Sequence, residues 1–419
     1  MVRLVDLPKW EQEHLLIKCG PPLGPTAWVQ NSKPLRQKRI ALITTAGLYL
    51  RGDESFAWGD STYRALPGDE DAGNYVMGQS SANFDRSGFQ ADVNVVFPLD
   101  RFKELVSDKT ISSLASFHYS FVGAGLLPQQ YESSVRSLAK ILKRDQVDAV
   151  FITPVCSNCT QSASAIAYYL ESEGVMTTTI GLVREIGVSM QPPRMLWTSF
   201  PLGHPLGKPN DAEFQHQVIR HALDLLERPE PPVLEDFPLD VPYVDVIDVP
   251  PCSITFTKPK IDATTFNARL HNELLSLRPW YDLNKRKRGR TTLGHSDSSI
   301  EEILTGLALW LDNPDGPFVD LEWFRLAILD AKAFYSEALM AQPGDIEVRQ
   351  VEAQMWNETV LGEALKSYYK YFEKDPRLAA VCTAIAPRQA IFTSTHEWEP
   401  GFAEETLRRR GQLDSKPGK

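Results

Sequence analysis

The chain has 419 residues, of which 42% are hydrophobic and 23% are charged. These values are ordinary for a globular protein, and the length is sufficient for two or three domains with a sizeable core. The formal net charge of −10 argues against a general nucleic-acid binder. The charged N-terminus has no apolar signal segment, and no run of about 20 apolar residues occurs. We therefore expect a cytoplasmic protein that does not cross a membrane.

The first 36 residues are expected to form an N-terminal arm. Prolines at positions 21, 22, 25 and 34 interrupt regular elements, and we expect Trp10 and Trp28 to pin the arm to the body of the protein. The apolar run 39–45 then predicts a strand that is buried on both faces. Residues 54–90 are rich in Gly, Ser, Asp and aromatic side chains, and we expect a long, ordered functional loop there.

Strand and helix patterns alternate along residues 38–228. The predicted strands are 92–97, 147–153, 174–180 and 195–198, with a short strand or helix at 111–119, and the predicted helices are 98–106, 131–144, 163–173 and 214–226. This alternation predicts an α/β fold over residues 37–228, with a largely parallel sheet and flanking helices in Rossmann-like layers. The ligand crevice of such a sheet lies at the carboxyl ends of its strands.

The composition of the chain changes after residue 228. Residues 229–255 are rich in proline and acidic side chains and are expected to form an extended linker. Residues 256–419 are expected to form a helical domain, with predicted helices at 263–277, 300–311, 321–340, 346–372 and 376–385. The basic run 285–290 is interpreted as a solvated loop, with an anion or partner contact as the alternative. Acidic and histidine side chains of this domain, Glu352 among them, match no metal-binding spacing and are interpreted as helical surface charge.

The chemistry of the sequence is concentrated in a C-x-x-C pair, Cys156 and Cys159. An apolar run of strand composition, residues 147–153, precedes the pair, and a helical pattern follows it. The first thiol is therefore expected near the positive end of a helix dipole, which lowers the pKa of a thiol, and the second can resolve a mixed disulfide. This context favours redox or nucleophilic chemistry.

Two other interpretations of the pair stay open. A structural zinc site needs about four ligands, whereas Cys19, Cys252 and Cys382 are isolated and no second C-x-x-C occurs. The two cysteines can also be inert structural thiols. The odd total of five cysteines argues against a disulfide framework.

At this stretch the chain resembles the selenoprotein B family of glycine, sarcosine and betaine reductases, with its relatives in D-proline reductase. The family pattern is an apolar strand, selenocysteine-x-x-cysteine, a helix and a further strand, and residues 150–180 follow it. Similar pieces occur in the same order elsewhere, namely residues 43–53, 84–88, 94–101, 118–121 and 200–207. The resemblance covers roughly residues 1–230, and the helical region lies outside it as a fused partner, an oligomerisation element or a lid.

The resemblance implies roles for both cysteines. Cys156 stands at the position of the family's selenocysteine and would attack an activated substrate carbon or a leaving heteroatom. Cys159 would release the product by forming a disulfide with Cys156, and an external dithiol or a thioredoxin-like protein would restore both thiols. A thiol is a weaker nucleophile than a selenol, so we expect slower cleavage of a C–N bond. The family activates its amine substrate on a pyruvoyl group of a partner subunit, and Cys252–Ser253 is the one place in this chain to look for such a group.

Further candidate site residues stand beside these two. His118 is the candidate general acid or base, although a histidine beside Tyr and Phe is more often part of the core. The candidate substrate-binding residues offer hydroxyl, carboxylate or guanidinium groups; they are Thr44, Thr45, Arg51, Asp85, Arg86, Tyr119 and His204. No metal ligand and no bound cofactor is predicted.

Three functional hypotheses follow. The first is a thiol-dependent reductase or reductive lyase that acts on a small amino-acid-like substrate. The second is a non-redox lyase for which Cys156 serves as the nucleophile or base. The third is a non-catalytic subunit of a larger reductase complex. The expected partners are a small-molecule substrate and a thioredoxin-like donor or a partner subunit, with a homo-oligomer as an open alternative and without nucleic acid or a membrane.

Overall fold

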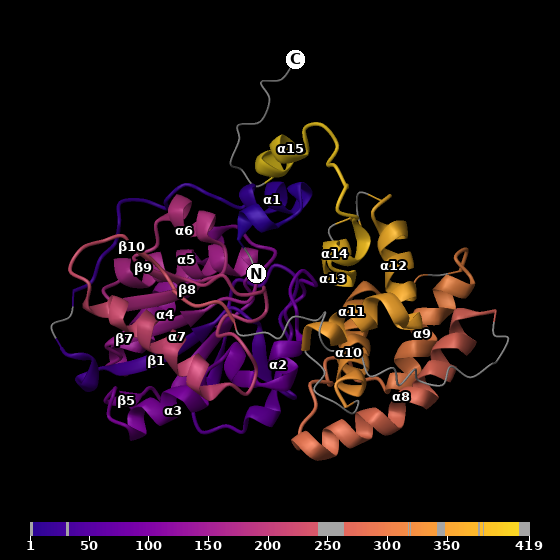
Figure 1. The fold of residues 1–419 in the computed structure, drawn as a ribbon, viewed down its shortest axis with the longest axis horizontal. Helices are drawn as coiled ribbons and strands as arrows, with labels where there is room; N and C mark the ends of the chain where they lie inside the picture. Colours follow the sequence, from indigo (N-terminus) through magenta and orange to yellow (C-terminus); the bar gives the residue numbers. More distant parts are fainter. Residues whose placement is uncertain are drawn as a thin grey trace.

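The computed structural model describes residues 3–30, 33–241, 264–316, 318, 320–341, 348–375, 378–379 and 381–409. An α/β part and a helical part lie side by side (Figure 1). The strands are β1 (Arg39–Thr44), β2 (Leu48–Leu50), β3 (Tyr63–Pro67), β4 (Tyr75–Met77), β5 (Ser113–Leu114), β6 (Phe117–Phe121), β7 (Ala149–Thr153), β8 (Met176–Gly181), β9 (Arg194–Trp197) and β10 (Val233–Asp236). The helices of the α/β part are α1 (Lys9–Leu16), α2 (Ser87–Ala91), α3 (Leu99–Ser107), α4 (Glu132–Arg144), α5 (Ser157–Ser172), α6 (Arg184–Met190) and α7 (Ala212–Asp224).

The main sheet has the strand order β10-β9-β8-β7-β1-β6-β3. Strands β10 to β6 run parallel, and only the edge strand β3 pairs antiparallel with its neighbour. The central pair β1 and β7 is aligned from Ile40 opposite Ala149 to Thr44 opposite Thr153. A largely parallel sheet with flanking helices, as the alternating pattern predicted, is thereby confirmed.

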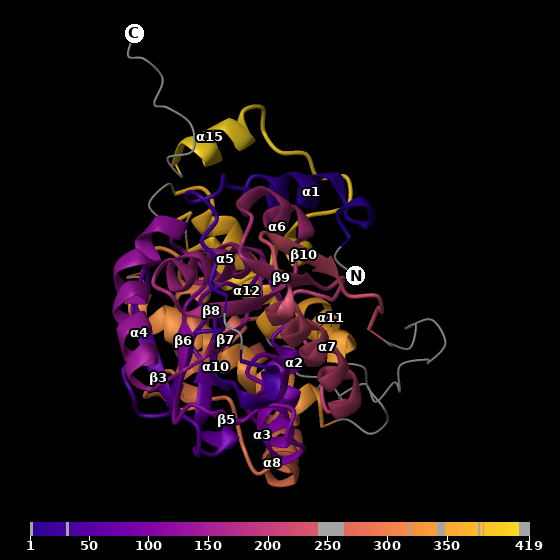
Figure 2. The same cartoon turned by 90° about the vertical axis from the view of Figure 1, so that its left-hand side faces the viewer.

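Alternate residues of the central strands face two separate apolar layers. Leu42 and Phe151 pack with α3 and α7, whereas Ile43 and Ile152 pack with α4 and α5. Figure 2 shows α4 on one side of the strands and α7 on the other. Both faces of the sheet are covered, which explains why β1 and β7 are apolar throughout rather than alternating.

Several sequence-based expectations were wrong in detail. The run 92–97 is not a strand, because the Asp92 carboxylate accepts a hydrogen bond from Asn94 N at 2.9 Å and starts a 3₁₀ turn. The arm contains helix α1, and four residues of the expected linker form the edge strand β10. The expected loop 54–90 includes β3, β4 and the start of α2.

The helical part has its own apolar core. Its helices are α8 (Phe266–Arg288), α9 (Ile300–Asp312), α10 (Leu321–Leu339), α11 (Val348–Glu358), α12 (Val360–Phe372), α13 (Cys382–Ile385) and α14 (Arg388–Ile391), followed by α15 (Phe402–Arg409). Trp310 and Trp356 are buried in this core, and Trp280 and Trp323 pack at its edge. None of the described helices combines the length and the apolar character that a membrane span requires.

The two parts meet along α2 and the segment before it. Arg288 and Arg290, from the predicted solvated basic run, donate hydrogen bonds to main-chain carbonyls of Phe89 and Gln90. The prediction of a solvated loop is therefore wrong, because residues 285–288 form the last turn of α8 and the guanidinium groups of Arg288 and Arg290 join the helical part to α2. Figure 1 shows α2 facing α10 and α11.

The chain termini also bridge the two parts. Trp10, in α1, packs edge-on against Phe392 at 5.4 Å between ring centroids, and its carbonyl accepts a hydrogen bond from Trp398 Nε1 at 2.9 Å. Trp28 covers the guanidinium of Arg194 at 3.5 Å from its ring centroid. Both tryptophans therefore hold the arm in place, Trp28 on the sheet and Trp10 on the C-terminal segment.

Candidate active site

The C-x-x-C pair lies where the sheet changes its direction of winding. The chain leaves β1 toward β6 on one side, and it leaves β7 toward β8 on the other. These neighbouring strands end at Thr44 and Thr153, and the residues that follow them meet at one edge of the sheet, where Thr45 N donates to Thr153 O at 3.0 Å. In open α/β sheets this switch point is the place of the ligand crevice.

Cys156 is the N-cap residue of α5. Its Sγ accepts a hydrogen bond from Cys159 N at 3.2 Å, and its backbone is extended, with φ −142° and ψ −178°. A side chain at this position faces the positive end of the helix dipole. The strand-to-helix placement of the first thiol is therefore confirmed.

Cys159 lies one turn into α5 and is fully buried. Its thiol donates to Thr45 O at 3.7 Å and is contacted by Gln79 Nε2 at 3.5 Å. The hydrogen bond from Cys159 N to Cys156 Sγ joins the two residues directly. Positions three residues apart in a helix bring their Cβ atoms within about 5 to 6 Å, whereas a disulfide requires about 3.5 to 4.5 Å, so the first turn of α5 has to shift for a disulfide to form.

The two thiols ionise differently. Burial raises the pKa of Cys156 well above that of a free thiol, and the contact with Cys159 adds to this rise. Burial also opposes ionisation of Cys159, but hydrogen bonds with Cys156 and with nearby main-chain groups outweigh it and lower its pKa. The expectation of a lowered pKa at Cys156 is thus wrong for this closed arrangement, because desolvation exceeds the effect of the helix terminus.

A residue that the sequence did not single out, Lys18, approaches the pair from the N-terminal arm. Lys18 Nζ donates to Ser157 Oγ at 2.5 Å, and Lys18 O accepts from Gln161 Nε2 at 2.8 Å. Its positive charge acts to lower the pKa of Cys156. Lys18 lies more than 130 residues from Cys156 in the chain, and no local pattern connects the two.

Asp85 and His204 come from two separate predicted segments, and the structure brings them together beside the pair. His204 Nε2 lies 2.9 Å from Asp85 Oδ2, and both side chains are buried. Burial opposes the charge of Asp85, but the partnership with His204 outweighs it and lowers the pKa of Asp85. Gly203 N donates to Val155 O at 2.7 Å, which ties this cluster to the residue before Cys156.

Only a glycine at position 203 allows the 200–207 loop to approach Asp85 this closely. Its φ is +101°, and a Cβ atom there would lie 1.9 Å from Asp85 O. A side chain at this position would push the 200–207 loop away from Asp85.

Arg86 shapes the segment that covers the thiols. Its guanidinium donates to the carbonyl oxygens of Met77, Gln79 and Ser81, and Gln79 in turn contacts Cys159. Burial lowers the pKa of Arg86 to about 10. Arg86 therefore holds Gln79 in place over the second thiol.

Thr44 and Thr45 lie at the strand end as expected. Thr44 Oγ1 is occupied by main-chain contacts with Thr153 and Ala46, whereas the buried Thr45 Oγ1 has no hydrogen-bond partner. Thr45 is therefore the hydroxyl at this edge that remains able to bind a ligand.

Three other candidates lie away from the pair. Arg51 donates to the carbonyls of Thr291 and Leu293 in the helical part. Tyr119 packs against Tyr63, and burial raises its pKa to about 12. His118 is buried, accepts from Leu42 N at 3.1 Å, and burial lowers its pKa to about 3. This is the environment of a core histidine, and no hydrogen bond among the described residues joins it to a thiol.

Over the ranges that the structure describes, no cluster of three or more His, Cys, Asp or Glu side chains is arranged to hold an ion. Cys252 and Ser253, the candidate pyruvoyl position, lie outside the described residues.

Gly123 provides a test of how tightly the pair is enclosed. A Cβ atom at this glycine would lie 2.8 Å from Cys159 Sγ and 2.9 Å from Thr45 Cβ. We expect Gly123→Ala to displace Cys159 and to slow oxidation of the pair by about tenfold or more, measured as the rate of loss of free thiols with a mild oxidant. Gly125→Ala, where a Cβ meets nothing within 4 Å, serves as a comparison, although its φ of +87° adds backbone strain. Equal oxidation rates in Gly123→Ala and the unmodified protein would show that the enclosure is loose.

The fold and the site together define an α/β protein with a buried C-x-x-C pair at the switch point of a parallel sheet. Residues 29–155 match the family of glycine/sarcosine/betaine reductase selenoprotein B (GRDB). The comparison thus confirms the resemblance of the α/β part to the selenoprotein B family. The matched range ends at Val155, directly before Cys156.

Individual relatives agree with this family. The chain is 28% identical over 217 residues to the D-proline reductase subunit gamma of Acetoanaerobium sticklandii, covering 51% of this chain and 88% of that relative. It is 24% identical over 213 residues to the glycine reductase complex component B subunit gamma of Symbiobacterium thermophilum, covering 47% and 48%. It is 26% identical over 210 residues to the betaine reductase complex component B subunit beta of Peptoclostridium acidaminophilum, covering 46% of each. The chain therefore spans less than half of the latter two relatives. No solved structure matches it.

Proposed function

We propose that the chain is a thiol-dependent reductase, or a reductive component of a larger complex, that acts on a small amino-acid-like substrate. The observation that carries this proposal is the hydrogen bond from Cys159 N to Cys156 Sγ at the start of α5, at the switch point of the sheet. Dithiol pairs at such helix starts undergo reversible oxidation. Relatives named as subunits of D-proline, glycine and betaine reductases support the substrate class and the involvement of a partner subunit.

The proposed reaction uses the two thiols in sequence. The Cys156 thiolate attacks the activated carbon of the substrate, so that a C–S bond forms while the bond to the leaving heteroatom breaks and the leaving group takes up a proton. Cys159 then attacks Cys156 Sγ, the C–S bond breaks with its electron pair on carbon, and the carbon takes up a proton. The substrate has gained two electrons and two protons, and the pair has become a disulfide. An external dithiol or a thioredoxin-like protein reduces the disulfide and is itself oxidised.

Each neighbouring residue has a part in this scheme. Lys18 and the N-terminus of α5 stabilise the thiolate of Cys156 once its burial is relieved. Thr45 offers a hydroxyl for the substrate. Asp85 and His204 fix the loop before α5, and Arg86 holds Gln79 over Cys159. His118 has no step in this scheme.

The proposal is tested by a substrate screen with dithiothreitol as the electron donor. We expect one or more amino acids or N-substituted amino acids to cause oxidation of dithiothreitol in proportion to enzyme, with release of an amine. Release of an amine without any consumption of dithiothreitol would indicate the non-redox lyase. If neither process occurs with the chain alone, addition of a partner subunit that co-purifies with it should restore turnover.

A non-catalytic subunit is the second candidate, and the burial of both thiols favours it. In that case the thiols would stay reduced under mild oxidants in the presence and absence of a partner. Oxidation of the pair would contradict this candidate.

A further inference from the structure

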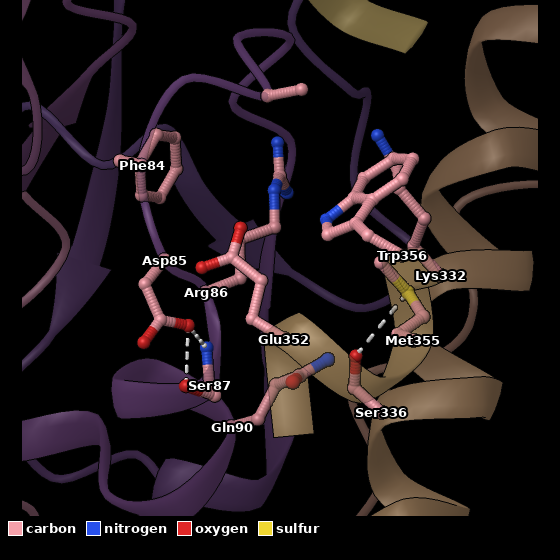
Figure 3. Close-up of a pocket in the computed structure, with 11 residues that line it drawn as sticks. Phe84, Asp85, Arg86, Ser87, Gln90, Lys332, Ser336, Glu352, Met355 and Trp356 are labelled. Atoms are coloured by element: carbon pink, nitrogen blue, oxygen red, sulfur yellow. Dashed lines mark hydrogen bonds between the residues drawn. The ribbon is translucent and has the colours of Figure 1, made fainter. Parts of the chain in front are cut away.

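A small cavity lies between the α/β part and the helical part. It has a volume of about 30 Å³, which is room for about two water molecules. Arg86, Ser87 and Gln90 line it from the α/β part, and Lys332, Glu352 and Trp356 line it from α10 and α11. Figure 3 shows Glu352 pointing from the helical part toward Arg86. Glu352 is thus not a surface charge, as its helical pattern suggested, but part of a polar interface.

The charged groups around this cavity are not paired with one another. No ion pair among the described residues joins Arg86, Lys332 and Glu352, and Lys332 Nζ donates only to Ala384 O, at 2.8 Å. Arg86 Nε and Gln90 Oε1 are buried without a hydrogen-bond partner, and the Gln90 side chain is 5% exposed. Buried polar and charged groups normally have partners. The unfilled hydrogen-bonding capacity therefore points to a bound molecule.

The protonation of these groups indicates the charge of that molecule. Burial, reinforced by Asp85, raises the pKa of Glu352 to about 8, so its carboxyl group is neutral near pH 7 and can donate a hydrogen bond. Asp85 is already satisfied by His204 and Ser87. Burial, reinforced by the charge of Arg86, lowers the pKa of Lys332 well below its usual value, so Arg86 carries the permanent positive charge of the site. The groups left for a ligand are mainly donors around this charge, which suits an acceptor that carries a negative charge.

A second small cavity, next to the first, indicates which chemical group the ligand carries besides its negative charge. It measures about 20 Å³ and shares Arg86 and Gln90 with the first. Its other walls are the apolar side chains of Met77, Phe89, Leu329 and Ala333, together with Thr292 and His295. A hydrocarbon group fits against the apolar part of these walls, which offers no partner for a second charge.

We propose that the interface between the two parts binds a short-chain carboxylate, whose carboxylate group is held by Arg86, Lys332 and Glu352 and whose hydrocarbon group faces Met77 and Phe89. At this site the helical part would bind the ligand directly. The site adjoins the segment that covers Cys159, because Arg86 belongs to both. The proposal does not depend on thiol chemistry, because binding can be measured on the reduced protein without turnover.

Acetate is the probe for this site, because it is a small carboxylate with a single apolar carbon. Isothermal titration of the full chain with sodium acetate at pH 7 should give saturable binding at one site per chain. Methylammonium at the same ionic strength should give no saturable signal. Lys332→Met, which removes the amino group and keeps the length of the side chain, should weaken acetate binding by about tenfold or more. Gln90→Leu tests the same site from the α/β side and should also weaken binding.

Lys370→Met is the matched control, because Lys370 is exposed on α12 and lies outside the cavity. Thermal unfolding of each variant establishes that it is folded. The proposal is overturned if acetate shows no saturable binding, if methylammonium binds instead, or if folded Lys332→Met and Gln90→Leu bind acetate as tightly as the unmodified chain. None of these results would bear on oxidation of Cys156 and Cys159.

Discussion

Cys156→Ser and Cys159→Ser are each expected to lower dithiol-dependent turnover by at least about a thousandfold. In the proposed reaction the first substitution removes the attacking sulfur, and the second prevents release of the product as the disulfide forms. Turnover is measured as dithiothreitol oxidation with whichever amino-acid-like substrate the screen yields. The two residues are buried side by side at the start of α5, so a hydroxyl in place of either thiol changes the volume of the site little.

Cys382→Ser provides the matched control for this experiment. Cys382 is also buried, but it lies in the core of the helical part and contacts Tyr369 O at 3.6 Å. We expect its turnover to stay within about twofold of the unmodified protein. Full activity in both Cys156→Ser and Cys159→Ser would rule out the thiol mechanism. Amine release that proceeds without dithiothreitol oxidation, and that is lost with Cys156→Ser alone, would support the non-redox lyase.

Glu171→Ala is expected to lower the free energy of unfolding much more than the loss of an exposed ion pair would. Glu171 and Arg194 form an ion pair at 2.6 Å in which neither side chain is exposed. The same pair anchors the arm, because Glu171 accepts from Val29 N at 2.5 Å and Arg194 donates to Val29 O at 2.9 Å. Removal of one partner leaves a buried guanidinium uncompensated, which costs about 3 to 5 kcal/mol.

The free energy of unfolding should be measured by urea denaturation at pH 8. Burial raises the pKa of Glu171 to about 7 in spite of Arg194, so its carboxylate is mainly charged at this pH. Glu173→Ala, in which a partly exposed pair with Arg136 is lost, should cost no more than about 1 kcal/mol. Equal losses in the two variants would contradict the structural importance assigned to the buried pair.

The sequence predicted the parts of the fold that depend on local pattern. The apolar strands β1 and β7, helix α4 and the position of Cys156 at the start of a helix all follow from runs of a few residues. The segment 92–97 was misread because its strand-like composition is overridden by the Asp92 side chain, which caps a turn. Strand β10 was missed because an edge strand of four residues within a proline-rich stretch has little pattern of its own.

Only those site residues that belong to a sequence motif could be predicted. The two cysteines, Asp85 and His204 were identified from such motifs, although nothing local indicated that Asp85 pairs with His204. Lys18 and Glu352 reach the site or its neighbourhood from distant segments, and their proximity is set by tertiary packing. The raised pKa of Cys156 could not be inferred either, since the helix terminus is visible in the sequence while the extent of burial is not.

The most direct test of the account is the mapping of disulfides in the native chain. The protein would be treated with a mild oxidant, alkylated, digested and analysed by mass spectrometry, with a parallel sample reduced by dithiothreitol. The account predicts a Cys156–Cys159 disulfide that forms in the folded protein, is reversed by dithiothreitol, and leaves Cys382 free. Two thiols that stay unpaired in the folded chain, and pair only after denaturation, would contradict it.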